Sequence, residues 1–188
     1  MGCGISTRGP QTPLYLNEFN PPCHELISLS CPFPSTFPPS GIIQNEIGTF
    51  FDDREHIKQC QIIHINEVTL ITDDYLVGIE LQYYLDGGIK CLKHSASVTG
   101  KKLVLTLQNS DSIVSCELTH EEKKIRSMKL ETLEGRTLDW VSQLGHGPEK
   151  SIINLLQQRR ALVAFRGKIS NCIEGLSIYS WRLCSKSK

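Results

Sequence analysis

Apolar and polar residues alternate along most of the chain beyond Gly41, with the two-residue period of β-strands. The run Val77–Tyr84 shows this most clearly, because its apolar side chains at every second position would share one face of a strand. The tripeptide Asp86–Gly88 then predicts a tight turn, after which Ile89 and Cys91 begin the return strand. This part of the sequence therefore predicts a β-hairpin.

Similar short runs continue toward the end of the chain. They predict further strands at Leu103–Leu107, Val114–Leu118, Met128–Thr132, Leu162–Phe165 and Leu176–Ser180. Only Ser151–Arg160 has the spacing of a helix, and its length is marginal. Many short strands at roughly ten-residue spacing predict an all-β sandwich, barrel or prism. We place this domain at residues 41–183, with a short C-terminal tail at 184–188.

Residues 1–40 have a different composition. Eight of the nine prolines lie there, and they are Pro10, Pro13, Pro21, Pro22, Pro32, Pro34, Pro38 and Pro39. Proline fixes φ and removes a backbone donor, so this segment is unsuited to a helix or to a central strand. We expect a Pro-rich extended arm that is either loose or draped over the folded domain.

Composition narrows the classes of function. The 188 residues carry 20 Lys+Arg and 20 Asp+Glu, so the formal net charge is zero. This balance argues against a nucleic-acid-binding protein, which normally needs an excess of basic side chains. No apolar run approaches the length of about 18 residues that a membrane-spanning helix requires. We therefore expect a neutral globular domain with no nucleic-acid partner and no membrane span.

The first six residues, Met1–Ser6, fit the pattern of N-myristoylation. Gly2 would be exposed after removal of the methionine and would carry the myristoyl chain, and Ser6 occupies the position where the pattern has Ser or Thr. One acyl chain holds a protein at a membrane only marginally, so stable anchoring needs a second signal. Arg8 is the only basic residue among the first 40, so the second signal would be a palmitoyl chain on Cys3.

The cysteines and acidic pairs suggest neither a metal site nor catalysis. The eight cysteines include no CxxC pair and no Cys/His spacing typical of zinc, and we expect no metal and no cofactor. We expect Cys91 and Cys116 to lie on apolar strand faces as small hydrophobic residues. The pairs Asp52–Asp53 and Asp73–Asp74 would point to opposite faces of a strand, so each pair would not converge on one substrate. The sequence therefore predicts a protein that is not an enzyme.

Four segments resemble the jacalin-related lectin family. Gly48–Asp53 is similar to the family's opening motif Gly-x-x-Phe-Asp-Asp, and Val163–Lys168 followed by Ser170–Tyr179 is similar to its closing segment. Val77–Tyr84 matches one of the strands between them. The resemblance covers about residues 41–181 and implies a β-prism I fold, which consists of three four-stranded Greek-key sheets.

The resemblance also implies a sugar site at one apex of the prism, without a metal. The opening glycine, Gly48, would leave room for the sugar, and the loop at residues 170–174 (the apex loop) would supply the polar groups. Carried over by position, Ser170 begins this loop, the backbone N–H groups of Asn171 and Cys172 are the donors, and Glu174 supplies the carboxylate. Vicinal hydroxyls of a sugar need such a rigid acceptor beside converging donors.

Three positions depart from the family pattern. Ser170 replaces a glycine, Glu174 replaces an aspartate, and Arg54 replaces the glycine that follows the Asp-Asp pair. A serine disfavours positive φ and close ligand approach, and a glutamate extends the carboxylate by about 1.5 Å. We therefore expect this apex loop to bind sugar less well than a loop that has the glycine and aspartate of the family pattern.

These observations lead first to a lipid-anchored binding or scaffold module on the cytosolic face of a membrane. Its acyl chains would contact the membrane, its β-domain would contact a protein partner, and its location would be cytoplasmic and peripheral to the membrane. Two alternatives stay open. One is a carbohydrate-binding lectin of mannose or galactose type that uses the apex loop, and the other is a structural subunit of a larger assembly.

Overall fold

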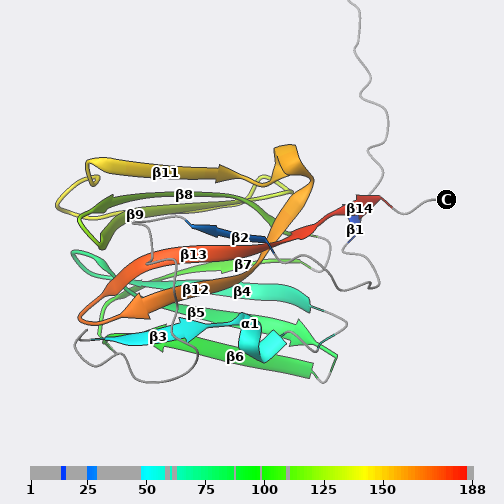
Figure 1. Ribbon diagram of the computed structural model, residues 1–188, viewed down its shortest axis with the longest axis horizontal. Coiled ribbons are helices and arrows are strands. Elements are labelled where there is room, and N and C mark those ends of the chain that lie inside the picture. Colours follow the sequence, from blue (N-terminus) through cyan, green and yellow to red (C-terminus); the bar gives the residue numbers. More distant parts are fainter. Residues whose placement is uncertain are drawn as a thin grey trace, which may run out of the picture.

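The computed structural model describes residues 14–15, 25–28, 48–57, 60, 63–86, 88–97, 99–108 and 111–185. Within these ranges nearly all regular structure is antiparallel β-strand, with one short helix α1 (Arg54–Ile57) and one 3-10 turn η1 (Leu156–Gln158) (Figure 1). The all-β class predicted from the alternation is therefore confirmed.

Three groups of four hydrogen-bonded strands form the body of the molecule. The first sheet contains, in spatial order, β3 (Thr49–Asp52), β12 (Arg160–Ile169), β13 (Ile173–Arg182) and β2 (Glu25–Ser28). The second contains β6 (Gly88–Ser95), β5 (Leu76–Leu85), β4 (Ile63–Thr72) and β7 (Lys101–Thr106). The third contains β11 (Glu149–Asn154), β8 (Ile113–Glu121), β9 (Lys124–Thr132) and β10 (Thr137–Val141). A separate short ladder pairs β1 (Leu14–Tyr15) with β14 (Cys184–Ser185).

The order of strands within the second and third sheets is that of a Greek key. In each of them three consecutive strands are neighbours, and the fourth returns to lie beside the first. A single backbone pair between Lys124 and Glu174 connects the third sheet to the first. These observations confirm the predicted prism of three four-stranded sheets, with the first sheet built from segments at both ends of the chain.

The core lies between the inner faces of the three sheets. Each sheet contributes fully buried side chains, including Tyr83 and Leu70 from the second, Leu118 and Ile125 from the third, and Phe165 from the first. In β10 buried and exposed residues alternate strictly, as expected for a strand with one face toward the core. In β12 the alternation fails because the register shifts beside β13, and such bulges rotate side chains between faces.

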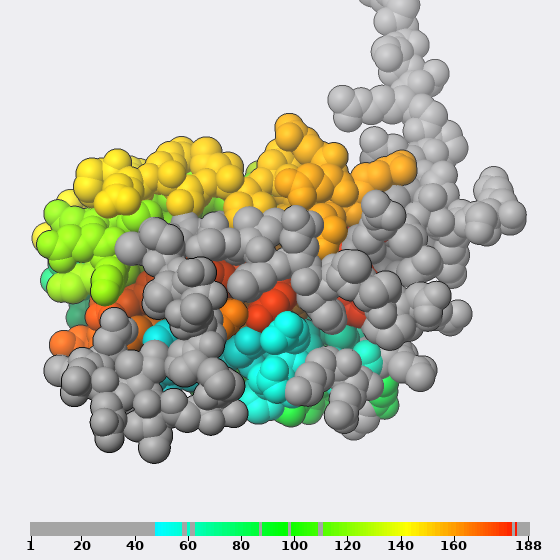
Figure 2. Space-filling model, in the orientation of Figure 1, coloured from blue at the N-terminus to red at the C-terminus, as the bar shows by residue number. Residues whose placement is uncertain are grey.

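The prediction of a helix at Ser151–Arg160 is wrong. The chain instead forms β11, with Ser151 paired to Leu118 and Ile153 paired to Cys116, and only η1 remains of the expected helix. A helix of ten residues gains little stability by itself, whereas pairing with β8 gives the backbone of residues 149–154 hydrogen-bond partners on one side. Figure 2 shows β11 and η1 at the surface along the top of the molecule.

The two cysteines expected on apolar faces have different environments. Cys116 is buried in the core, and burial raises the pKa of its thiol to about 12. Cys91 is exposed, because it lies on the outer face of β6, so the expectation for this residue is wrong. The alternation of the β5–β6 hairpin was visible in the sequence, but it did not show which face of β6 is covered.

Two short segments within residues 1–40 have described backbone positions. Residues of β2 pair with β13 from Ser177 to Ser180, and β1 pairs with β14. The Pro-rich segment thus supplies the edge strand of the first sheet. The predicted acylation sites Gly2 and Cys3 lie outside the described residues.

The adjacent Asp52 and Asp53 point in different directions and bind different partners. The buried Asp53 lies 2.5 Å from His94 Nε2 through Oδ1, and its Oδ2 accepts hydrogen bonds from the Tyr83 hydroxyl (3.4 Å) and the Phe165 N–H (3.3 Å). Burial and the neighbouring Asp53 carboxylate raise the pKa of Tyr83 well above its usual value, so the hydroxyl stays a donor. Asp53 therefore joins β3 to the core, as a structural residue.

Asp52 binds on the other face. It accepts a hydrogen bond from the Tyr179 hydroxyl at 2.9 Å, and its Oδ2 lies 3.9 Å from Arg166 Nε. Burial and this hydrogen bond raise the pKa of Tyr179 to about 12. The two carboxylates thus do not converge, as the strand geometry predicted.

Replacing Asp53 with alanine should lower the free energy of unfolding by about 3 kcal/mol, because buried hydrogen-bonding partners lose their acceptor. Urea denaturation followed by fluorescence measures this change. Asp73→Ala is the matched control, because Asp73 is exposed and should tolerate the change. Equal stabilities of the two variants would contradict the structural role of Asp53.

Candidate functional site

The apex loop is the tip of the hairpin formed by β12 and β13 (Figure 1). Ile169 and Ile173 are the last paired residues, and the three residues between them make the turn. Immediately after the loop, Gly175 is an extra residue in β13 with φ +68°, and its N–H donates to the Lys123 carbonyl at 3.3 Å. This bulge sets the direction of Glu174, which lies opposite Lys168 in the ladder.

Gly48 lies beside this loop, because β3 pairs with the end of β12 through Thr49 and Ile169. Its φ is +139°, which side chains rarely adopt. A Cβ atom at this position would lie 2.8 Å from the Ile169 carbonyl oxygen and 2.7 Å from Cε of Lys168. Gly48 is thus required by a close approach of two backbones, and Lys168 extends across the space beside it.

The Glu174 carboxylate has two partners within the protein. The hydroxyl of Ser170 donates a hydrogen bond to Oε1, and the ammonium of Lys168 lies 3.9 Å from Oε2. The Lys168 side chain is 9% exposed and that of Glu174 is 21% exposed, so the pair is largely removed from solvent. The carboxylate is therefore held in one position beside Gly48.

Two backbone donors of the apex loop lack a partner among the described residues. The N–H of Ser170 donates to the Cys172 carbonyl at 3.0 Å, whereas the N–H groups of Asn171 and Cys172 donate to no described atom. Asn171 is exposed, and Cys172 is buried against Ile71. Burial, followed by the nearby Glu174 carboxylate, raises the pKa of the Cys172 thiol, so this residue packs as a neutral apolar group.

The structure thus brings all five residues predicted for the sugar site to one end of the prism. Sequence reasoning missed two further residues there. Lys168 was part of the quoted closing segment but was assigned no role, and Tyr75 carried no signal at all. The Tyr75 ring packs against the cluster that contains Cys172, and Lys124 Nζ lies 4.8 Å above it. Both contacts depend on residues far apart in the sequence.

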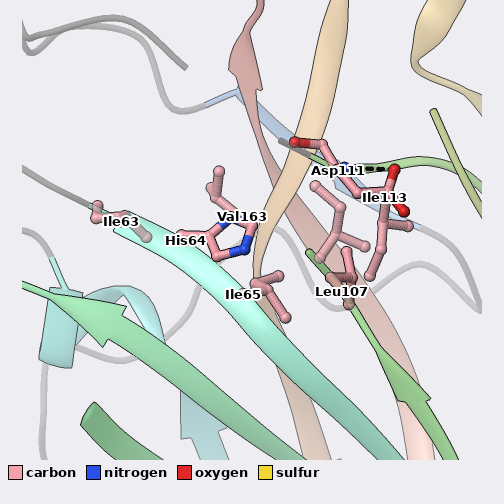
Figure 3. A pocket seen from close by; sticks show the side chains of 9 residues that line it. Ile63, His64, Ile65, Leu107, Asp111, Ile113 and Val163 are labelled. Carbon is pink, nitrogen blue, oxygen red and sulfur yellow. Dashed lines mark hydrogen bonds between the residues drawn. The ribbon is translucent and has the colours of Figure 1, made fainter. Parts of the chain in front are cut away.

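A small cavity at the opposite end of the prism does not contribute to this site (Figure 3). Its volume is about 10 Å³, which is room for about one water molecule. His64 lines it, and burial lowers the pKa of this histidine, although the nearby Asp111 carboxylate opposes the shift. A cavity of this size cannot hold a sugar.

The described ranges contain no helix that is long and apolar enough to cross a membrane. Within the same ranges, no three His, Cys, Asp or Glu side chains are grouped in a way that could hold a metal ion.

The geometry defines a class of protein: a β-prism with a candidate ligand-binding loop at one end. A family model for the jacalin-like lectin domain matches residues 40–179, so the chain belongs to this family. The family consists of non-enzymatic carbohydrate-binding domains, in agreement with the expectation that this protein is not an enzyme. A search among curated proteins finds no match.

Solved lectin structures share the fold. The structure is similar to artocarpin in complex with mannotriose, with 16% identity over 71% of this chain and 90% of artocarpin and a TM-score of 0.60. It is also similar to wild-type Malaysian banana lectin, with 15% identity over 73% of this chain and 93% of that lectin and a TM-score of 0.60. A prostate-specific WGA16 glycoprotein lectin matches at 15% identity over 76% and 96% of the respective chains, again with a TM-score of 0.60.

Replacing Gly48 with alanine should destabilise the protein by about 2 kcal/mol or more, since the new Cβ adds a backbone clash to the strain of positive φ. Gly88→Ala is the matched control, because Gly88 also has positive φ (+112°) but no atom within 4 Å of the new Cβ. Comparing the thermal unfolding of the two variants separates the effect of the backbone clash from the effect of positive φ. If Gly48→Ala were no more destabilising than the control, the close approach at Gly48 would be wrong.

Proposed function

We propose that the protein binds carbohydrate at the end of the prism that carries Gly48 and the apex loop. The observation that carries this proposal is that one short loop holds the Glu174 carboxylate and two backbone N–H groups without a described partner, those of Asn171 and Cys172. A carboxylate accepts hydrogen bonds from hydroxyl groups, and N–H groups donate to their oxygens. Vicinal hydroxyls of a hexose present both functions at adjacent atoms.

Family membership supports this proposal more than it supports a lipid-anchored scaffold. Among the similar structures, artocarpin is described in complex with mannotriose and mannopentose and as a lectin with mannose specificity. We therefore take a mannose-type ligand as the first candidate, with a galactose-type ligand as the alternative. Ser170 and Glu174 fill two of the three positions that differ from the family pattern.

Glu174→Ala should weaken binding of mannotriose by about 10-fold or more, because it removes a charged acceptor of the sugar hydroxyls. Isothermal titration of the purified full chain measures the affinity, and a glycan array identifies other ligands. Glu131→Ala is the control, because Glu131 is an exposed carboxylate in the third sheet. Saturable glycan binding that is unchanged in Glu174→Ala would place the site elsewhere.

A second proposal concerns location and rests on the sequence pattern at Met1–Ser6. Myristoylation of Gly2 and palmitoylation of Cys3 would anchor the protein to the cytosolic face of a membrane, because two acyl chains bind stably where one does not. Such an anchor is compatible with a binding site on the prism. In this arrangement the domain would present its ligand site, or a surface for a protein partner, close to the membrane.

Gly2→Ala should move the protein from the membrane fraction to the soluble fraction of cells, since the acyl acceptor is lost. Cys3→Ser should leave a weak and reversible association, because one myristoyl chain remains. Gly4→Ala is the control, since it preserves both acceptors. Fractionation followed by immunoblotting measures the distribution, and a membrane-bound Gly2→Ala variant would refute the anchor.

A further inference from the structure

The two apex-loop residues that depart from the family pattern contact each other. Ser170 stands where the pattern has glycine, Glu174 stands where it has aspartate, and the Ser170 hydroxyl donates to Glu174 Oε1. The other carboxylate oxygen faces the Lys168 ammonium at 3.9 Å. We infer that Ser170 and Glu174 form a matched pair, in which the serine hydroxyl restrains the longer carboxylate, and that Lys168 is a positioning residue for the same carboxylate. Ser170 and Lys168 together hold the Glu174 carboxylate as a fixed acceptor for a sugar hydroxyl. This inference rests on the carbohydrate-binding function proposed above.

Serine fits its position without backbone strain. Among the described residues other than glycine, positive φ occurs only at Glu122 and Arg159, so Ser170 has an ordinary φ. The expected cost of replacing a left-handed glycine therefore does not arise here. The serine side chain instead provides a donor at the place where the longer glutamate needs one.

The extra methylene of Glu174 makes this contact necessary. Glutamate reaches about 1.5 Å farther than aspartate and has one more rotatable bond, so an unrestrained carboxylate would sample several positions. The Ser170 hydroxyl and the Lys168 ammonium restrain its two oxygens separately. A restrained acceptor loses less conformational freedom when a ligand binds.

Lys168 is suited to this role by its burial. Its side chain is only 9% exposed, and it runs from the space beside Gly48 to the Glu174 carboxylate, with Nζ 5.7 Å above the Phe50 ring. A buried ammonium requires a compensating charge, and Glu174 is the carboxylate opposite it in the ladder. Each carboxylate oxygen has more than one acceptor position, so both retain the capacity to accept from a sugar hydroxyl.

A double-mutant cycle on the full chain tests the matched pair, with mannotriose as the titrated probe. Ser170→Gly and Glu174→Asp should each weaken binding about 10-fold, because each removes the hydrogen bond between the two side chains. The double variant restores the Gly and Asp of the family pattern and should bind within about 3-fold of the native protein. A double variant about 100-fold weaker than the native protein would show independent effects and overturn the inference.

Lys168 is tested by conservative rescue. Lys168→Met keeps the apolar stem but removes the charge and should weaken binding about 10-fold, whereas Lys168→Arg should stay within about 3-fold of the native protein. Lys101→Met is the control, because Lys101 is an exposed lysine at the start of β7. Equal affinities of the Met and Arg variants would show that the charge has no positioning role.

The same variants separate failure of this inference from failure of the proposed function. If the native protein binds neither mannotriose nor any glycan on an array, carbohydrate binding is refuted. The double-mutant cycle of Ser170→Gly and Glu174→Asp is then measured by thermal unfolding instead of by binding affinity. Each single variant should lower Tm by about 3 °C, and the double variant should lose no more than either one, because both changes remove the same hydrogen bond. Additive losses of Tm in the double variant would overturn the matched pair by this second measurement.

Discussion

The antiparallel ladder between β12 and β13 joins segments from the whole length of the chain. On one side β12 pairs with β3, and on the other β13 pairs with β2 and meets β9 at Glu174. Phe165 and Ile178 face each other in this ladder and are fully buried in the common core. The position of the apex loop therefore follows from core packing, and within the loop Asn171 is exposed whereas Cys172 is buried.

The acidic pair of the opening segment has a structural role in this molecule. Asp53 binds His94, Tyr83 and the Phe165 backbone on the inner side of the first sheet, while Asp52 binds Tyr179 on the outer side. These contacts hold β3 at the edge of the sheet. Gly48 is thereby kept close to the end of β12. The acidic pair therefore contributes to the candidate site by positioning Gly48, and we assign it no contact with a ligand.

The fold and the site differ in how much sequence change they tolerate. The similar lectins share the architecture at 15–16% identity, because alternating strands and turns at suitable intervals are satisfied by many sequences. A ligand site depends on a few atoms at hydrogen-bond distance, so a single methylene matters there. In this chain the longer carboxylate of Glu174 has the Ser170 hydroxyl and the Lys168 ammonium as partners.

The sequence alone was sufficient for the all-β class, for hairpins such as the one at Asp86–Gly88, and through a family resemblance for the set of residues at the apex loop. These features depend on side-chain alternation and on local turn preferences, which neighbouring residues determine. The tertiary structure decided the strand Glu149–Asn154 where a helix was expected at Ser151–Arg160, the exposure of Cys91, and the contacts of Lys168 with Gly48 and Glu174. These depend on which distant segments pack together, and that packing is a property of the whole core rather than of any local stretch.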